Sequence, residues 1–132
     1  MNDRTITQSI ETETEPETIF DLLADPRNIP KWAPLFADEV SGDGKRGWLV
    51  TKDGKSFVLH VASSPSSGTV DYLREIAPGR VGGAYIRVLP RPGTGSTIVM
   101  TLPITPGITE EKVATILRGE LAQLVQMSLQ SH

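Results

Sequence analysis

Cysteine is absent from this chain of 132 residues, and histidine is nearly so. Without cysteine there is no disulfide, no zinc site built on thiolates and no cysteine nucleophile. The two histidines, His60 and His132, do not make a metal pair, and the aspartates lack the spacing of a calcium loop. We therefore expect no metal and no cofactor.

A surplus of positive charge is also missing. Lys and Arg number 13 against 16 Asp and Glu, so the formal net charge is −3. Proteins that bind nucleic acid carry a basic stripe or patch, and an anionic membrane surface attracts a similar patch. No such cluster occurs in the sequence, which predicts no nucleic-acid partner.

The third absence is a long hydrophobic run. A membrane-spanning helix needs roughly 18 or more consecutive apolar residues, and no such run occurs. Residues 1–15 are polar and acidic, unlike the apolar centre of a signal peptide. We expect a cytoplasmic protein without membrane insertion. The length and the 38% of hydrophobic residues indicate one domain, 1–132.

Proline and glycine divide the chain into candidate strands and helices. β-branched residues predict a strand over 4–12. Pro16 suits the first position of a helix over 16–24, and a second short helical segment is expected over 27–33. Further strands are expected over 37–41, 46–52, 55–62, 68–76, 82–89 and 96–104.

The chain closes with a long predicted helix. Thr109 is a suitable N-cap, and Glu110 and Glu111 follow in the first turn, where the helix dipole favours negative charge. Apolar residues then recur at helical spacing for about five turns, as far as Ser128. Because the strands are grouped apart from the helices, we predict an α+β fold. A curved antiparallel sheet of six or seven strands would wrap around the C-terminal helix.

The Asp53-Gly54 pair sets the register of one hairpin. Trp48 should then oppose Leu59 on the face that meets the long helix, because side chains alternate along a strand. Extended over the next hairpins, this face is mostly apolar. It comprises Trp48, Val50, Phe57, Leu59, Val61, Val70, Tyr72, Arg74, Ile76, Ala84, Ile86, Val88, Ile98, Met100 and Leu102. A bulge at Gly82-Gly83 would exchange the inward and outward faces of the later strands.

Three residues on the inward face carry polar groups: Trp48, Tyr72 and Arg74. Polar groups that are buried need hydrogen-bond partners, which a filled apolar core does not offer. A ligand pocket, by contrast, uses a few fixed polar groups to orient a largely apolar guest. The pattern therefore favours a pocket in which Arg74 holds a ligand oxygen. The competing interpretation directs the Tyr72 hydroxyl and the Arg74 guanidinium to solvent.

Several short motifs together resemble the helix-grip (SRPBCC) superfamily, which contains birch-pollen-allergen-like proteins, START domains and polyketide cyclases. They are Thr7-Gln-Ser-Ile10, Pro16-Glu-Thr-Ile-Phe-Asp-Leu-Leu23, Asp25-Pro26, Ile29-Pro30-Lys31-Trp32, Arg87-Val-Leu-Pro90 and Gly95-Ser-Thr97. A bacterial subgroup similar to polyketide cyclases and dehydrases matches in more detail, at Gly68-Thr-Val-Asp-Tyr72, Ile86-Arg-Val88 and Thr101-Leu-Pro103. The resemblance implies a cavity between the sheet and the long helix for a hydrophobic molecule or lipid. It also implies that a minority of relatives catalyse cyclisation, dehydration or hydrolysis.

The first hypothesis is a binding protein for a small hydrophobic or aromatic molecule. The residues expected to contact the ligand are Trp32, Trp48, Leu59, Tyr72, Arg74, Ile86, Met100, Leu117 and Leu121. Ordinary core packing beneath the short helices is the alternative interpretation of Trp32.

The second hypothesis is an enzyme of the cyclase or dehydratase type. Tyr72 or His60 would act as acid or base, and an arginine would stabilise an oxyanion. His60, Asp71 and Arg87 form a second polar cluster, which enters the pocket only if the strand faces are reversed. Otherwise these three residues form a cross-strand ion pair on the solvent face. A third hypothesis is a non-catalytic interaction protein with a filled core, no cavity and scope for a homodimer through the outer sheet face.

Overall fold

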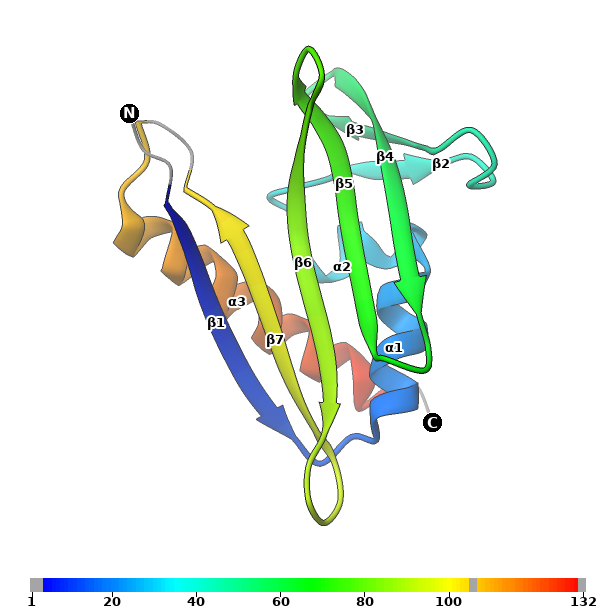
Figure 1. Ribbon diagram of the computed structural model, residues 1–132, viewed down its shortest axis with the longest axis vertical. Helices are drawn as coiled ribbons and strands as arrows, with labels where there is room; N and C mark the ends of the chain where they lie inside the picture. Colours follow the sequence, from blue (N-terminus) through cyan, green and yellow to red (C-terminus); the bar gives the residue numbers. More distant parts are fainter. Residues whose placement is uncertain (1–3, 105–106, 131–132) are drawn as a thin grey trace.

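The computed structural model describes residues 4–104 and 107–130 of the chain. Its strands form a seven-stranded antiparallel sheet with the order β1-β7-β6-β5-β4-β3-β2 (Figure 1). The strands are β1 (Thr5–Thr12), β2 (Glu39–Ser41), β3 (Trp48–Lys52), β4 (Lys55–Ser64), β5 (Thr69–Ala77), β6 (Arg80–Pro90) and β7 (Ser96–Pro103). The helices are α1 (Pro16–Ala24), the 3₁₀ turn η1 (Pro26–Asn28), α2 (Ile29–Trp32) and α3 (Glu110–Ser128).

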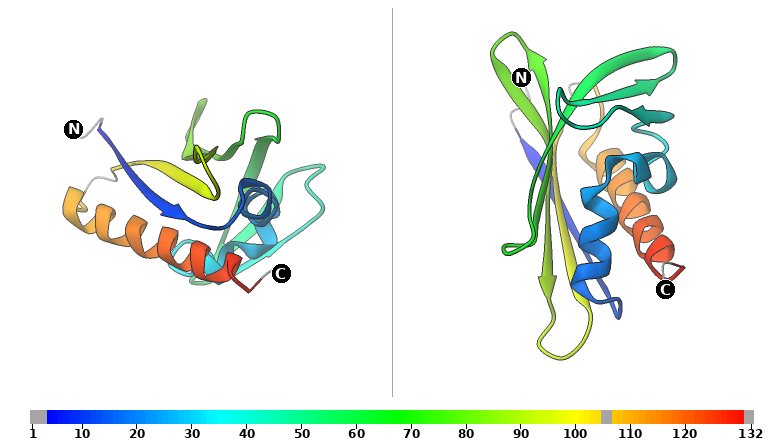
Figure 2. Two further views of the ribbon diagram at one scale, coloured as in Figure 1. Left: turned by 90° about the horizontal axis from the view of Figure 1, so that it is seen from below. Right: turned by 90° about the vertical axis from the view of Figure 1, so that its right-hand side faces the viewer.

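The helices lie on one face of the sheet, and the sheet curves around α3 (Figure 2). This arrangement confirms the predicted α+β, helix-grip architecture. α1 begins at Pro16 as expected, while the short segment predicted over 27–33 is divided between η1 and α2. The side chain of Thr109 accepts a hydrogen bond from the Lys112 amide, which confirms the predicted N-cap of α3. No helix in the described ranges is long and apolar enough to cross a membrane.

The β3–β4 hairpin has the predicted register. Lys52 pairs with Lys55, and Trp48 pairs with Leu59. Asp53 and Gly54 adopt φ values of 52° and 78°, the left-handed conformation that a two-residue type I′ turn requires at both positions. The two-residue turn decides which residues are paired, and side chains directly opposite each other in an antiparallel pair point to the same face.

The face predicted to meet the helices is the buried one. Val50, Leu59, Val70, Ile86 and Ile98 are at most 1% exposed. An irregularity does interrupt the β5–β6 pairing, but it lies between Glu75 and Ala77 near the hairpin tip, not at Gly82-Gly83. The later strands therefore keep their predicted parity.

A cluster of buried hydroxyl groups joins the C-terminal end of α3 to the sheet. The Thr14 and Ser128 hydroxyls lie 3.0 Å apart, and the Ser96 hydroxyl donates to the Thr14 carbonyl at 2.6 Å. Thr14 lies between β1 and α1, Ser96 begins β7 and Ser128 ends α3. These bonds hold that end of α3 against the sheet.

Candidate ligand-binding site

A cavity of about 520 Å³ lies between the sheet and helices α2 and α3. Apolar side chains form most of its wall, among them Leu59 and Met100 from the sheet and Val113 from α3. Leu35 and Ile108 at its rim are exposed, with 66% and 38% of their surface accessible. The cavity therefore has an apolar wall that continues into an apolar rim.

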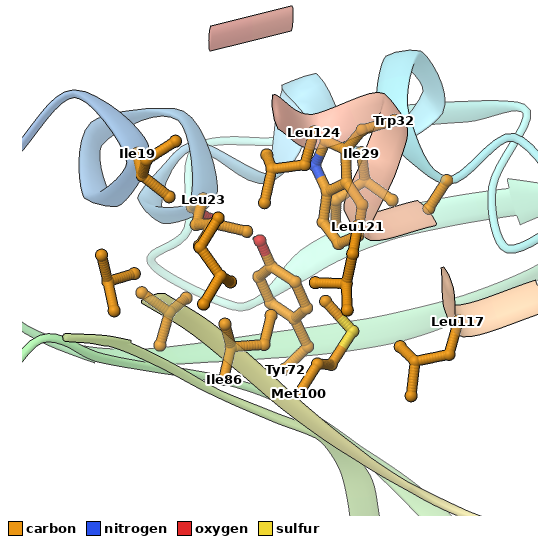
Figure 3. Close-up of a cluster of buried hydrophobic side chains, with 14 of the residues drawn as sticks. Ile19, Leu23, Ile29, Trp32, Tyr72, Ile86, Met100, Leu117, Leu121 and Leu124 are labelled. Atoms are coloured by element: carbon orange, nitrogen blue, oxygen red, sulfur yellow. The ribbon is translucent and has the colours of Figure 1, made fainter. Parts of the chain in front are cut away.

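Two aromatic side chains meet at the inner end of the cavity wall. The ring centroids of Trp32 and Tyr72 are 6.2 Å apart, with their planes inclined by 30° (Figure 3). Both residues are nearly fully buried. The Trp32 Nε1 group has no hydrogen-bond partner, although it is buried. An unsatisfied donor of this kind is uncommon in a protein interior.

The Tyr72 hydroxyl already has a partner in the protein. It donates to the Leu23 carbonyl at 2.5 Å, and Figure 3 shows the oxygen directed toward Leu23. Leu23 lies in the last turn of α1, where helix carbonyls lack partners within the helix. Burial, together with the negative charge of Asp25, raises the Tyr72 pKa far above its usual value. Tyr72 is thus a protonated cap of α1 rather than a free acid.

Arg74 brings a positive charge into the cavity wall. Its guanidinium carbon lies 3.7 Å from the centroid of the Phe57 ring, a close cation–π contact. The Nε group is buried without a hydrogen bond, and no carboxylate within the described residues forms an ion pair with the side chain. The contact with Phe57 restrains the guanidinium group, and the Nε donor has no partner within the described part of the protein.

Glu120 brings a negative charge into the wall from α3. Burial raises the pKa of its carboxyl group to about 7, and no hydrogen bond or ion pair is found for it in the described part of the chain. The sequence prediction missed Glu120 because only apolar positions of the helix were considered. A signal was present, since Leu117, Leu121 and Leu124 surround Glu120 at helical spacing and place it within the apolar stripe.

The predicted contact residues divide into two groups. Trp32, Leu59, Tyr72, Arg74 and Met100 line the cavity.

The other four predicted contacts do not line the cavity. Ile86, Leu117 and Leu121 are at most 1% exposed and are enclosed by the core beside it. Trp48 lies outside the lining as well, at the start of β3, where its ring is 5.9 Å from the Arg27 guanidinium carbon. These four residues do not border the cavity, because sharing the inward face does not decide which side chains lie next to empty space; their contact with a ligand stays a prediction.

The second polar cluster lies on the outer face of the sheet. His60 and Arg87 are exposed, His60 pairs with Leu73, and Asp71 pairs with Tyr85. No hydrogen bond or ion pair joins His60, Asp71 and Arg87 in the described structure, so the expected cross-strand ion pair is not formed. Because the strand faces are not reversed, the three residues are directed away from the cavity. Within residues 4–104 and 107–130, no group of three or more His, Asp or Glu is placed to hold a metal ion.

Comparisons with known proteins agree with this geometry. Residues 3–129 match the family described as polyketide cyclase / dehydrase and lipid transport. The protein XoxI from Bacillus cereus superposes with a TM-score of 0.70 at 19% identity, covering 100% of this chain and 99% of its own. A START superfamily protein from Mycobacterium smegmatis superposes with a TM-score of 0.68 at 15% sequence identity. The superposition covers 97% of this chain and 99% of that protein. Ara h 8.0201 superposes with a TM-score of 0.61 at 17% sequence identity, covering 96% of this chain and 98% of its own.

These identities are low, so the superpositions establish a shared fold. No curated protein matches the chain in sequence. The family match extends from the first strand to the end of the long helix, and the sheet and helices described above have the arrangement of its structural relatives. The chain belongs to the polyketide cyclase / dehydrase and lipid transport family.

Proposed function

We propose that the protein binds a small, largely apolar molecule whose carboxylate or carbonyl oxygen contacts Arg74. The observation that carries this proposal is a cavity of about 520 Å³ with an apolar wall and an arginine that has no carboxylate partner. Pockets of this size, mostly apolar with a few polar groups, are typical of small-molecule binding.

The state of Arg74 supports an acceptor on the ligand. A buried donor without a hydrogen bond is unfavourable by about 1–3 kcal/mol, and more where the group is charged. An oxygen of a bound molecule would remove that penalty at the Arg74 Nε group. Because the contact with Phe57 already restrains the guanidinium group, little side-chain entropy is lost when the oxygen binds.

Binding is favoured over the two alternatives. The enzyme hypothesis depended on Tyr72 or His60, but Tyr72 caps α1 and His60 lies on the outer face. The interaction-protein hypothesis depended on a filled core, whereas a cavity open to one side lies between the helices and the sheet. The family description, which includes lipid transport, is compatible with a carrier of an apolar molecule.

The proposal is tested first by native mass spectrometry of the protein as purified from cells, followed by extraction of any bound molecule. A co-purifying hydrophobic molecule with a carboxylate or carbonyl group is the expected result. An empty protein that also fails to bind apolar probes would contradict the proposal.

The role of Arg74 is tested with anilinonaphthalene sulfonate, a fluorescent apolar anion. Arg74→Gln is expected to weaken its binding by roughly tenfold or more, as the loss of a charge-assisted hydrogen bond implies. Arg87→Gln is the matched control, because it removes the same charge from the outer face of the same sheet. Equal dissociation constants for the two variants, measured by fluorescence titration, would exclude Arg74 as the anchor.

A further inference from the structure

The cavity wall contains two opposite charges that do not pair with each other. Arg74 projects from β5 and Glu120 from α3, so they approach the cavity from the sheet and from the helix layer. They are the charged residues of the wall, and no salt bridge within 4.0 Å connects them. Each charged group is therefore without a partner of opposite sign in the described protein.

The carboxyl group of Glu120 is partly buried in the cavity wall. Its pKa of about 7 has one cause, burial, and no cation or hydrogen bond offsets it. On α3 the neighbouring Arg118 is exposed and is hydrogen-bonded to Thr115, so it does not neutralise Glu120. An isolated carboxylate in such a place destabilises the fold unless a partner is supplied.

We infer that Glu120 is a second polar contact of the ligand, and that the ligand carries a hydrogen-bond donor at the end opposite its oxygen acceptor. This inference rests on the function proposed above, in which Arg74 holds the acceptor end. The ligand class is an elongated apolar molecule with a carboxylate or carbonyl at one end and a hydroxyl or amino group at the other. A carboxyl group accepts hydrogen bonds from both kinds of donor, and an ammonium group adds charge attraction.

The test uses three series of probes with alkyl chains from hexanoic to dodecanoic acid. The first series is the plain acids, the second the ω-hydroxy acids and the third the ω-amino acids. Their dissociation constants are measured by isothermal titration calorimetry with the wild type, Glu120→Gln and Glu120→Leu. Glu111→Gln is the matched control, because Glu111 is exposed on the same helix and lies outside the cavity wall.

The measured quantity is the preference for the ω-substituted acid over the plain acid of equal length. For at least one chain length, the wild-type protein should bind the ω-amino acid more tightly than the plain acid. Glu120→Gln should reduce this preference by roughly tenfold, because it removes the charge, and should retain much of the ω-hydroxy preference. Glu120→Leu should abolish both preferences, and Glu111→Gln should change neither.

Two results would overturn the inference, and they are distinguishable. If the plain acids bind in an Arg74-dependent manner but no chain length shows a preference that Glu120 controls, this inference fails and the proposed function stands. If no acid of any series binds the wild type, the acceptor end proposed at Arg74 and the donor end inferred at Glu120 fail together. Circular dichroism of each variant establishes that the fold is retained.

Discussion

At the scale of single residues, the Tyr72 hydroxyl has a structural task. Its hydrogen bond to the Leu23 carbonyl ties the middle of the sheet to the end of α1. Tyr72→Phe leaves this buried carbonyl without a partner, so we expect the free energy of unfolding to fall by about 1–3 kcal/mol. Urea denaturation measures the change. Binding of anilinonaphthalene sulfonate should be unaffected, and a loss of binding without a loss of stability would assign the hydroxyl to the ligand instead.

Glu120 makes stability depend on pH. Its pKa rises from the ordinary value of 4.5 to about 7 on folding, so between these values the folded state holds the proton more firmly than the unfolded state. The contribution of Glu120 to stability should therefore be most favourable below pH 4.5, decline as the pH rises to about 7, and stay lower above that. The upper limit of the loss is about 3 kcal/mol, at about 1.4 kcal/mol for each pH unit.

Removing the Glu120 charge should remove this pH dependence. Glu120→Gln is expected to be more stable than the wild type at pH 8 and similar to it at pH 4. Glu11→Gln, on the exposed face of β1, is the control and should retain the wild-type profile. Denaturant midpoints across the pH range provide the comparison, and parallel curves for the wild type and Glu120→Gln would refute the assignment.

At the scale of elements, the β5–β6 pair depends on a glycine beside the cavity. A Cβ atom at Gly83 would lie 1.7 Å from the Tyr72 carbonyl oxygen, so the two strands would have to separate. Gly83→Ala is expected to destabilise the protein by more than about 2 kcal/mol, since backbone must move to relieve the clash.

The adjacent glycine provides a control for that substitution. A Cβ atom at Gly82 would meet only the side chain of Ile76, at 3.0 Å, and that side chain is flexible and half exposed. Gly82→Ala should therefore cost much less than Gly83→Ala in thermal or urea unfolding. Equal losses would show that the strands adjust to the added methyl group.

The elements themselves were predictable because their signals are local. The Asp53-Gly54 turn, Pro16 at the start of α1 and the Thr109 cap each depend on a few neighbouring residues, and all three are confirmed. The division of the segment around 27–33 into η1 (Pro26–Asn28) and α2 (Ile29–Trp32) was not predicted, because short helical turns give no periodic signal that separates 3₁₀ from α geometry.

At the scale of the whole molecule, the cavity is a property that residue spacing does not encode. Alternation along the strands correctly sorted the inward from the outward side chains. The apolar spacing of α3 did not separate Leu117, which fills the core, from Ile116, which borders the cavity, because both belong to the apolar stripe of that helix. That distinction depends on the distance between the helix layer and the curved sheet, which many residues set together.

The sheet order has one more consequence, for how the chain is made. β1 is synthesised first, yet it pairs with β7, and Thr5 lies opposite Pro103. At about 5–20 residues per second, β1 waits roughly 5–20 s on the ribosome before its neighbour exists. During that time Ile6 and Ile10, which later face the core, have neither α3 nor β7 to cover them. The sheet closes only after β7 has been synthesised, and loop closure over nearly a hundred residues then slows folding.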